Sequence, residues 1–372
     1  MAPAVLNREC MTSHSWLSRN APLRIGYVPL TDAAPLIAAR RLGLFEKHGV
    51  QVELSRELGW GTIRDKIVYN ELDAAHAPGG LLFSLLAGTH SAAVKVRALM
   101  LLSCQGNAIT LSRRLWEKGA RDGKSLKKVI RVESPRCPVF AVVAWYSTHH
   151  HLLRLWLREA GIDPDKQVRI TVLPPPLVGE HMRAGLIDGF CAGEPWNSAA
   201  VMQGEGWIAA TSRDLAPGHP EKILFAQSSR MDSRPEDFAA LRAALREACG
   251  WCESPENRPE LAALLKQEVF PCLPLEVVRN ALTGPCDLGA GVFTDPTAFH
   301  RFATGDGCAT TVEQAVWTLQ PLEEGHLRKL TPAQRLAAIA AWLNQSEHSP
   351  SAIPGSPSPV SVQSPFPVQS LS

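Results

Sequence analysis

The sequence predicts an α/β protein of two lobes with a ligand cleft between them. Strand-like and helix-like segments alternate along most of the chain, which is typical of largely parallel sheets covered by helices. A polar, turn-rich segment at 113–128 separates a first alternating array from a second, and from about residue 223 the chain returns to the first lobe. Ligands of open α/β sheets bind beyond the carboxyl ends of the strands, so we expect the cleft where the lobes face each other.

The first array opens with a β-α-β unit. Apolar residues alternate at its start as in a half-buried strand, and Thr31 or Asp32 can cap the helix that follows. Glycines end that helix before the next strand. The elements expected, in order, are a strand at 23–27, a helix from about 33, a strand at 50–54, a helix from about 62 and a strand at 72–76.

The second array repeats this alternation, and the rest of the chain is mostly helical. We expect in it a helix at 148–160, a strand at 167–173, a helix carrying His181 and Met182, and a strand at 186–190. Later helices are expected at 235–252, 257–268, 311–319 and 331–344. The domain prediction is a flexible N-terminus (1–22), a discontinuous first lobe (23–112 and 223–345), a second lobe (113–222) and a disordered Ser/Pro-rich tail (346–372).

Composition and charge exclude several classes of protein. The chain has 38 Lys and Arg against 36 Asp and Glu, so its net charge of +2 gives no broad basic field for direct nucleic-acid binding. No stretch reaches the roughly 18 apolar residues of a membrane span. The N-terminal segment lacks the apolar core of an export signal, so we expect a soluble protein without membrane contact, located in the cytoplasm.

Nine cysteines, an odd number at wide spacing, indicate reduced thiols rather than a disulfide framework. Cys249 and Cys252 form a CxxC pair, which in a redox protein stands at a helix N-terminus after a strand. Here the pair closes a helical run, and a single CxxC is only half of a zinc site. We therefore favour a structural role for both thiols.

Candidate ligand-binding residues lie in segments that follow predicted strands. A small oxyanion held without a metal needs a cation, several N–H donors and a dry pocket. Lys222 could supply the charge, Gln105 an amide donor and Trp60 an indole N–H on an apolar wall. Each has an ordinary alternative, namely a solvated surface lysine, a glutamine that fixes a turn, and a core tryptophan. The segments concerned are 57–61, 103–107, 189–197 and 218–222.

The sequence resembles the NrtA-like nitrate/bicarbonate branch of the type II solute-binding proteins. The resemblance rests on GYVPLTDAAPL, GWGTIRDK, QGNAITLSRRL, LPPPLVGEHMRAGLIDGFCAGEPWN and GHPEK, which keep the family's order. It implies an α/β, two-lobed, type II periplasmic-binding-protein-like fold. It also implies that Trp60, Gln105 and Lys222 hold nitrate, with Gly106 of the QGN segment in the same ligand-binding set. Bicarbonate-binding relatives replace this lysine with an acidic residue and recruit a metal, so Lys222 implies nitrate or nitrite, with no metal and no cofactor.

A histidine and a tryptophan complete the expected site. Consecutive side chains of a helix point about 100° apart, so the histidines at 149–151 cannot all face one ion. We favour His149 as the cleft residue and expect His150 and His151 at the surface. Trp196 is included in the ligand-binding set on the hinge side. The neighbouring Glu194 would repel an anion, so we expect it to bond the backbone or orient Trp196, with a structural turn as the alternative.

The resemblance further implies a particular function. The family contains cytosolic nitrate/nitrite sensors of the NasS type, which hold an RNA-binding antiterminator with an ANTAR domain, of the NasT type, until the anion releases it to act on nitrate assimilation genes. Two alternatives stay open: a substrate-binding component of a nitrate-type ABC transporter, and an enzyme on the same fold. No Ser/His/Asp order, phosphate loop or HExxH helix is present in the sequence, so we expect no catalytic residues and no enzyme activity.

Overall fold

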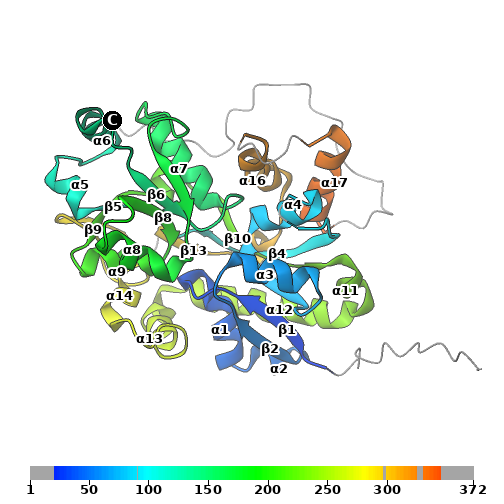
Figure 1. Cartoon of the computed structure of the whole chain (residues 1–372). Coiled ribbons are helices and arrows are strands. Elements are labelled where there is room, and N and C mark those ends of the chain that lie inside the picture. Colours follow the sequence, from blue (N-terminus) through cyan, green and yellow to red (C-terminus); the bar gives the residue numbers. More distant parts are fainter. Residues whose placement is uncertain (1–20, 90, 296–298, 325–329, 345–372) are drawn as a thin grey trace, which may run out of the picture.

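The described residues form two α/β units, each built on its own sheet (Figure 1). The computed structural model describes residues 21–89, 91–295, 299–324 and 330–344. The flexible N-terminus predicted for 1–22 and the disordered tail predicted for 346–372 lie outside the described residues, apart from Ala21 and Pro22. In the described ranges no helix is both long enough and apolar enough to cross a bilayer.

The first unit is organised around a six-stranded sheet. Its strands are β1 (Leu23–Tyr27), β2 (Val52–Arg56), β3 (Ala74–Pro78), β4 (Val96–Gln105), β10 (Pro220–Gln227) and β13 (His300–Phe302). They lie in the order β13-β4-β10-β3-β1-β2. β1 is parallel to β2 and β3, whereas β10 is antiparallel to both of its neighbours, β3 and β4. This central position leaves every residue of β10 buried.

The second unit contains a five-stranded sheet. Its strands are β5 (Asn107–Ser112), β6 (Val139–Val142), β7 (Arg169–Val172), β8 (Gly189–Gly193) and β9 (Gly206–Thr211). Their order is β7-β6-β8-β5-β9, with β6 parallel to β7 and β8 and with β5 antiparallel to β8 and β9. A separate two-stranded ribbon pairs β11 (Cys286–Gly289) with β12 (Val292–Thr294).

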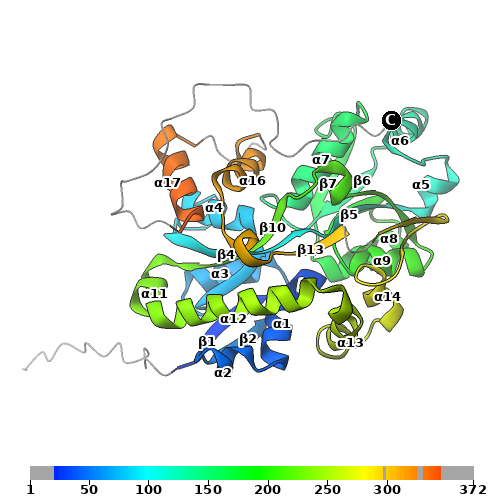
Figure 2. The same cartoon turned by 180° about the vertical axis from the view of Figure 1, so that it is seen from behind.

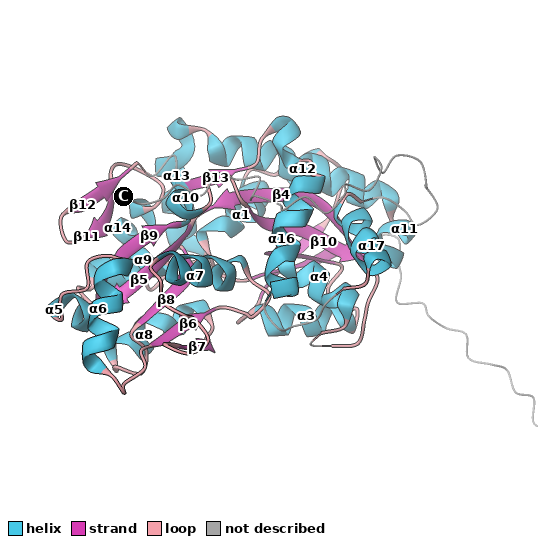
Figure 3. Cartoon of the chain, turned by 90° about the horizontal axis from the view of Figure 1, so that it is seen from above, coloured by secondary structure: helices cyan, strands magenta, loops and turns pink. Residues whose placement is uncertain are grey.

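Helices cover both sheets, as the view from above shows (Figure 3). Up to residue 133 they are η1 (Thr31–Ala33), α1 (Ala34–Arg41), α2 (Leu44–Lys47), α3 (Trp60–Val68), α4 (Gly79–Ala87), α5 (Arg113–Glu117) and α6 (Gly123–Glu133). The next are α7 (Thr148–Glu159), η2 (Pro175–Leu177), α8 (Val178–Arg183), α9 (Trp196–Met202), α10 (Ser212–Leu215), α11 (Ser228–Ser233) and α12 (Pro235–Glu253). The last are η3 (Pro255–Asn257), α13 (Arg258–Glu268), α14 (Leu275–Asn280), η4 (Gly305–Cys308), α16 (Val312–Glu324) and α17 (Pro332–Trp342).

The longest helix, α12, shows how sequence pattern decides packing. Pro235 lies in its first turn, where the missing N–H costs no hydrogen bond. Its buried residues recur at intervals of three and four and include Phe238, Leu241, Leu245 and Cys252. With α1 it covers one face of the first unit, while α4, α16 and α17 lie on the other face (Figure 2).

The two CxxC thiols are core residues of this helix and do not form a redox or zinc site. Cys249 and Cys252 lie near the end of α12 with no exposed surface, in the core of the first unit. Burial raises the pKa of the Cys252 thiol, which makes it less reactive. These positions agree with the structural role that we favoured.

The chain crosses between the sheets at two places. β4 ends at Gln105 and β5 starts at Asn107 in the other sheet, so the change falls at Gly106 and not at the predicted boundary after residue 112. The chain returns through α10 to β10. Gln105 and Gly106 both have left-handed backbone angles, with φ of 61° and 81°. Two consecutive left-handed residues produce the sharp turn that the crossing requires.

Candidate functional site

Lys222 lies in β10 and has no exposed surface. Its register places it opposite Pro78 of β3 and Ser103 of β4. The ammonium Nζ is 2.7 Å from a carboxylate oxygen of Asp32 and 2.5 Å from one of Glu221. The structure therefore excludes the ordinary alternative of a solvated surface lysine.

Lys222 and its two carboxylates keep each other charged. Burial alone would raise the pKa of Asp32, but Lys222 and His76 lower it well below its usual range. Burial also opposes ionisation of Glu221, and Lys222, His149 and His219 outweigh it and lower the pKa. The pKa of Lys222 is raised, because the two carboxylates outweigh the burial that would lower it. These three buried side chains thus carry two negative charges against one positive charge.

Trp60 begins α3 and is 2% exposed. The Lys222 ammonium lies 5.6 Å from the centroid of its ring, within the range of a cation–π contact. The indole N–H has no hydrogen-bond partner among the described residues. An unpaired buried N–H costs about 1–3 kcal/mol, which a ligand oxygen could recover.

His149 approaches the same cluster from the second unit. It lies in the first turn of α7, whose preceding residue Ser147 caps the helix. Both ring nitrogens are buried without a hydrogen-bond partner in the described part of the chain, and Nε2 is 3.9 Å from Glu221. Burial lowers the pKa of His149 to about 4, although Glu221 acts in the opposite direction. The imidazole is therefore neutral near pH 7.

The other two histidines of the run are not surface residues, contrary to our expectation. His150 is buried, with Nδ1 2.9 Å from the carbonyl oxygen of Trp145. His151 is half-buried, and its ring meets Trp317 edge-on at 5.3 Å. Other elements, among them β8, α10 and α16, pack against α7 and cover much of its first turn. The three side chains point in different directions, as expected, because they face Glu221, Trp145 and Trp317 respectively.

Gln105 and Gly106 form the turn between the sheets. The Gln105 carbonyl Oε1 accepts a hydrogen bond of 2.8 Å from the backbone N–H of Gly218 and so ties this turn to the segment before β10. The Gly106 N–H donates to Phe299, and its carbonyl accepts from Glu194. Gly106 is required sterically, because a Cβ atom there would lie 2.3 Å from Nδ1 of His300. A contact of either residue with a ligand stays a prediction.

The Glu194–Trp196 segment lies where β8 leads into α9. Glu194 is buried, and its carboxylate accepts a 3.1 Å hydrogen bond from the Ser198 backbone N–H. Burial raises the pKa of Glu194 to about 7. The half-buried Trp196 packs edge-on against Phe270, with ring centroids 6.2 Å apart. Glu194 thus bonds the backbone as expected, and none of the described contacts joins Trp196 to Lys222.

Three members of the cluster were not predicted from the sequence. Asp32 was considered a helix cap, but α1 has no side-chain cap and the Asp32 carboxylate pairs with Lys222. Glu221 also accepts a 2.6 Å hydrogen bond from the Asn107 side chain. His219 is buried and stacks on Trp317, with ring centroids 5.0 Å apart, and its Nε2 has no partner among the described residues. Glu221 and His219 belong to the GHPEK segment, and its resemblance to the family was the sequence signal that could have identified them.

This arrangement suits a small polar ligand. Lys222 and Trp60 come from the first unit and His149 from the second, and in the described part of the chain the Trp60 and His149 side chains near this buried charge have no hydrogen-bond partner. Buried polar groups are nearly always paired, so such a concentration needs a bound partner. Within the described residues no three His, Cys, Asp or Glu side chains are arranged to hold a metal.

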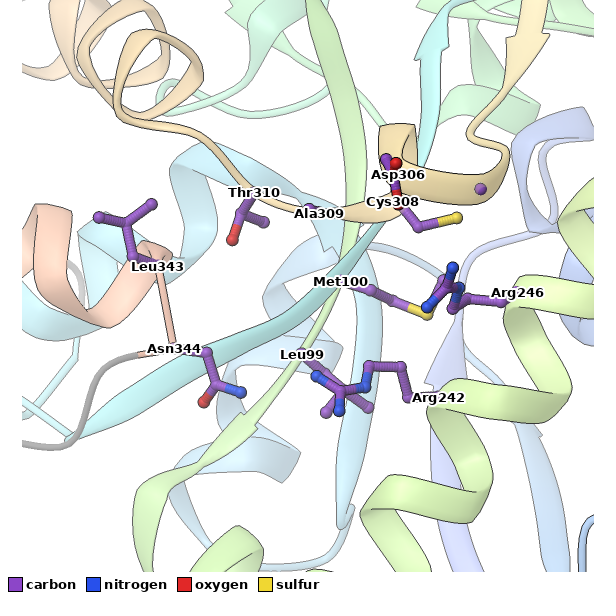
Figure 4. A pocket seen from close by; sticks show the side chains of 11 residues that line it. Leu99, Met100, Arg242, Arg246, Asp306, Cys308, Ala309, Thr310, Leu343 and Asn344 are labelled. Atoms are coloured by element: carbon purple, nitrogen blue, oxygen red, sulfur yellow. The ribbon is translucent and has the colours of Figure 1, made fainter.

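A cavity of about 430 Å³ lies elsewhere, between α12, β4, η4 and the end of α17 (Figure 4). Arg242 and Arg246 line it from α12, and Asp306 lines it from η4. Both arginines are exposed to water, which weakens any electrostatic contact with an anion. We therefore assign the candidate anion site to the buried cluster around Lys222.

Comparison with known proteins supports this architecture. Residues 18–266 match the NMT1-like family. The chain is 39% identical over 303 residues to the nitrate import ATP-binding protein NrtC of Synechocystis, covering 81% of this chain and 45% of that protein. It is 30% identical over 322 residues to the nitrate/nitrite binding protein NrtA of Nostoc, covering 84% and 72%. The chain spans less than half the length of the first curated relatives that it matches.

Comparison with solved structures also supports the two-lobed fold. The periplasmic nitrate-binding protein NrtA of Synechocystis superposes with a TM-score of 0.80 at 27% identity, covering 85% of this chain and 84% of that one. The alkanesulfonate-binding protein SsuA of Xanthomonas axonopodis, at 16% identity and a TM-score of 0.66, shares the fold and covers 88% and 99%. The predicted two-lobed periplasmic-binding-protein fold is thereby confirmed, and the chain belongs to the NMT1-like family of NrtA-like solute-binding proteins.

Proposed function

We propose that this chain binds nitrate or nitrite between its two units, as the solute-binding component that works with an ABC-type importer. The observation that carries the proposal is the fully buried Lys222, near the indole N–H of Trp60 and the imidazole of His149, neither of which has a hydrogen-bond partner among the described residues. The names of the relatives, which concern nitrate and bicarbonate binding and import, favour an importer component over an enzyme.

The site chemistry supports an oxyanion as the ligand. Ammonium and indole N–H groups donate hydrogen bonds and accept none, so they select a ligand rich in acceptors. Charge-assisted hydrogen bonds are strongest where water is excluded. A ligand that contacts Lys222 and His149 together would also join the two units, because these residues stand on β10 and α7.

Calorimetric titration of the purified chain tests the ligand. We expect nitrate or nitrite to bind, with bicarbonate and alkanesulfonates much weaker. Trp60→Phe keeps the apolar ring and removes the N–H, so nitrate affinity should fall by about 1–3 kcal/mol. Trp116→Phe is the matched control, because Trp116 lies on α5 against Trp207 and away from the cluster. An unchanged affinity in Trp60→Phe would remove Trp60 from the site.

The cytosolic sensor is a competing proposal that differs in its partner and not in its ligand. Its support is the resemblance to the NasS-type proteins. In that case the chain would form a complex with an ANTAR-type antiterminator, and nitrate or nitrite would dissociate it. Gel filtration of the two purified proteins with and without nitrate, together with cell fractionation, decides between the proposals. A complex that nitrate dissociates favours the sensor, and loss of nitrate uptake on deletion favours the importer.

A further inference from the structure

The buried cluster has a charge balance that is unusual for an anion site. Asp32 and Glu221 carry two negative charges against the single positive charge of Lys222, and all three are buried. Before any imidazole is protonated, the group has a net charge of −1. Adding a monovalent anion would make it −2 in a dry interior, where uncompensated charge is costly. On the proposed function, a second positive charge must therefore accompany the ligand.

The second positive charge could in principle be a metal cation, but the site is not built to bind one. The described residues contain no group of His, Cys, Asp and Glu side chains arranged for a metal. A proton is the remaining small cation, and imidazoles are its natural acceptors near neutral pH. The Nε2 of His76 lies 3.1 Å from the Asp32 carboxylate, so a proton on His76 would serve that carboxylate whether or not the ligand is present. His219 is partly engaged, with Nδ1 3.1 Å from the Pro220 carbonyl oxygen and its face against Trp317.

His149 differs from both, because neither of its ring nitrogens has a hydrogen-bond partner among the described residues. The His300 ring is unpartnered there as well, but it is His149 whose Nε2 lies 3.9 Å from a carboxylate of the cluster, that of Glu221. The charged and titratable groups that face it are Glu221 and Lys222 of β10, Asp32 of η1 and His219 before β10. Of the groups on other elements beside α7, Asp214 of α10 is held in its own capping box with Thr211. An imidazolium at this position would lie 3.9 Å from the Glu221 carboxylate and would donate from both nitrogens.

We propose that nitrate enters the site together with one proton, which His149 takes up. The proton comes from solvent and adds to a neutral ring nitrogen of His149, and no other bond changes. The imidazolium then donates one N–H toward nitrate and the other toward Glu221. Nitrate is the conjugate base of a strong acid and does not itself titrate, so the proton belongs to the protein. The inference rests on the proposed function, since it concerns how that site balances the charge of its ligand.

The sign of the pH effect follows from the empty and occupied states. In the empty site the pKa of His149 is about 4, so the imidazole is neutral at pH 7. A bound anion raises this pKa, and the complex then holds more protons than the free protein. Nitrate affinity must therefore increase as pH falls, by about tenfold per pH unit between the free and the bound pKa values of His149. Below the free pKa the affinity should level off.

Calorimetry in paired buffers tests the proposal directly. Nitrate is titrated into the full chain near neutral pH in phosphate and in Tris, whose protonation enthalpies differ. The difference between the two binding enthalpies then gives the number of protons taken up. We expect about one proton per nitrate in the parent protein. In His149→Gln we expect uptake to fall below half of that value, with a flatter pH dependence of affinity.

His150→Gln is the matched control, because this neighbour on α7 contacts Trp145 and not the cluster. It should keep the proton uptake of the parent. Nitrate binding without proton uptake in the parent, or unchanged uptake in His149→Gln, would overturn the proposal. If His149→Gln no longer binds nitrate, the pH dependence of the parent decides alone, and a flat affinity overturns the proposal. No anion binding by the parent at any pH would instead contradict the proposed function.

Discussion

At the scale of single residues, Lys222 shows what a local sequence can and cannot specify. The GHPEK segment predicted a lysine in a ligand site, and the structure buries that lysine between Asp32 and Glu221. Successive side chains of a strand normally point to opposite faces, so adjacent Glu221 and Lys222 would not be expected to pair. Irregular pairing of β10 with β4 on both sides of Lys222 changes this geometry. Asp32 is remote in sequence, and no local pattern indicates its contact.

Lys222→Ala should impair the fold as well as the site. The substitution leaves Asp32 and Glu221 buried without their cation, and breaking a buried ion pair costs about 3–5 kcal/mol. We expect the free energy of urea unfolding at neutral pH to fall by about that amount. The loss should be smaller at acidic pH, where the uncompensated carboxylates can take up protons.

Lys47→Ala serves as the control for this measurement, because Lys47 pairs with Glu247 at an exposed position. Exposed pairs contribute about 0–1 kcal/mol, so its unfolding should hardly change. If Lys222→Ala unfolds at the urea concentration of the parent protein, the two carboxylates are not charged in the folded state. Nitrate titration of any folded Lys222→Ala protein should show no binding.

At the scale of elements, the sequence predicted the type of most segments and the bounds of some, such as β1 and α12, but it misplaced several strands. The strands expected at 50–54, 72–76 and 186–190 lie two or three residues further along, at β2, β3 and β8. Alternation and glycine positions locate a strand, but hydrogen bonding to neighbouring strands decides where it ends. The same limit explains the change of sheet at Gly106, because this single residue separates β4 from β5 and nothing local shows that the two strands join different sheets.

Gly106→Ala should destabilise the crossing between the sheets. A Cβ atom would meet the His300 ring in a backbone conformation that L side chains rarely adopt. We expect a loss of about 1–3 kcal/mol in the free energy of unfolding. Gly119→Ala is the matched control, because Gly119 also has a positive φ and nothing lies within 4 Å of its added Cβ. The cost at Gly106 should exceed that at Gly119, and His300→Ala should recover part of it; equal costs at the two glycines would contradict the steric argument.

At the scale of the whole molecule, contacts between the two units hold the site closed. The backbone N–H of Thr31, in the first unit, donates a 2.8 Å hydrogen bond to the Glu194 carbonyl oxygen of the second. The start of α4 meets the segment between β6 and α7, since a Cβ atom on Gly80 would lie 1.8 Å from the carbonyl oxygen of Tyr146. Such contacts join segments far apart in the chain, so the sequence could predict two lobes but not how closely they approach.

Gly80→Ala should therefore act as a wedge that keeps the two units apart. The added methyl group cannot fit against a backbone oxygen in the closed arrangement, yet Gly80 lies in the first turn of α4, where alanine is a favourable residue. Each unit should fold, while nitrate affinity falls by at least about tenfold, or 1.4 kcal/mol, because the ligand must then work against the clash. In saturating nitrate, small-angle scattering should show a larger radius of gyration for Gly80→Ala than for the parent protein.

Gly250→Ala is the control, because Gly250 is exposed in α12 and nothing lies within 4 Å of its added Cβ. This variant should bind nitrate and become compact like the parent protein. Parent-like affinity and compaction in Gly80→Ala would show that nitrate binding does not depend on this approach of the two units.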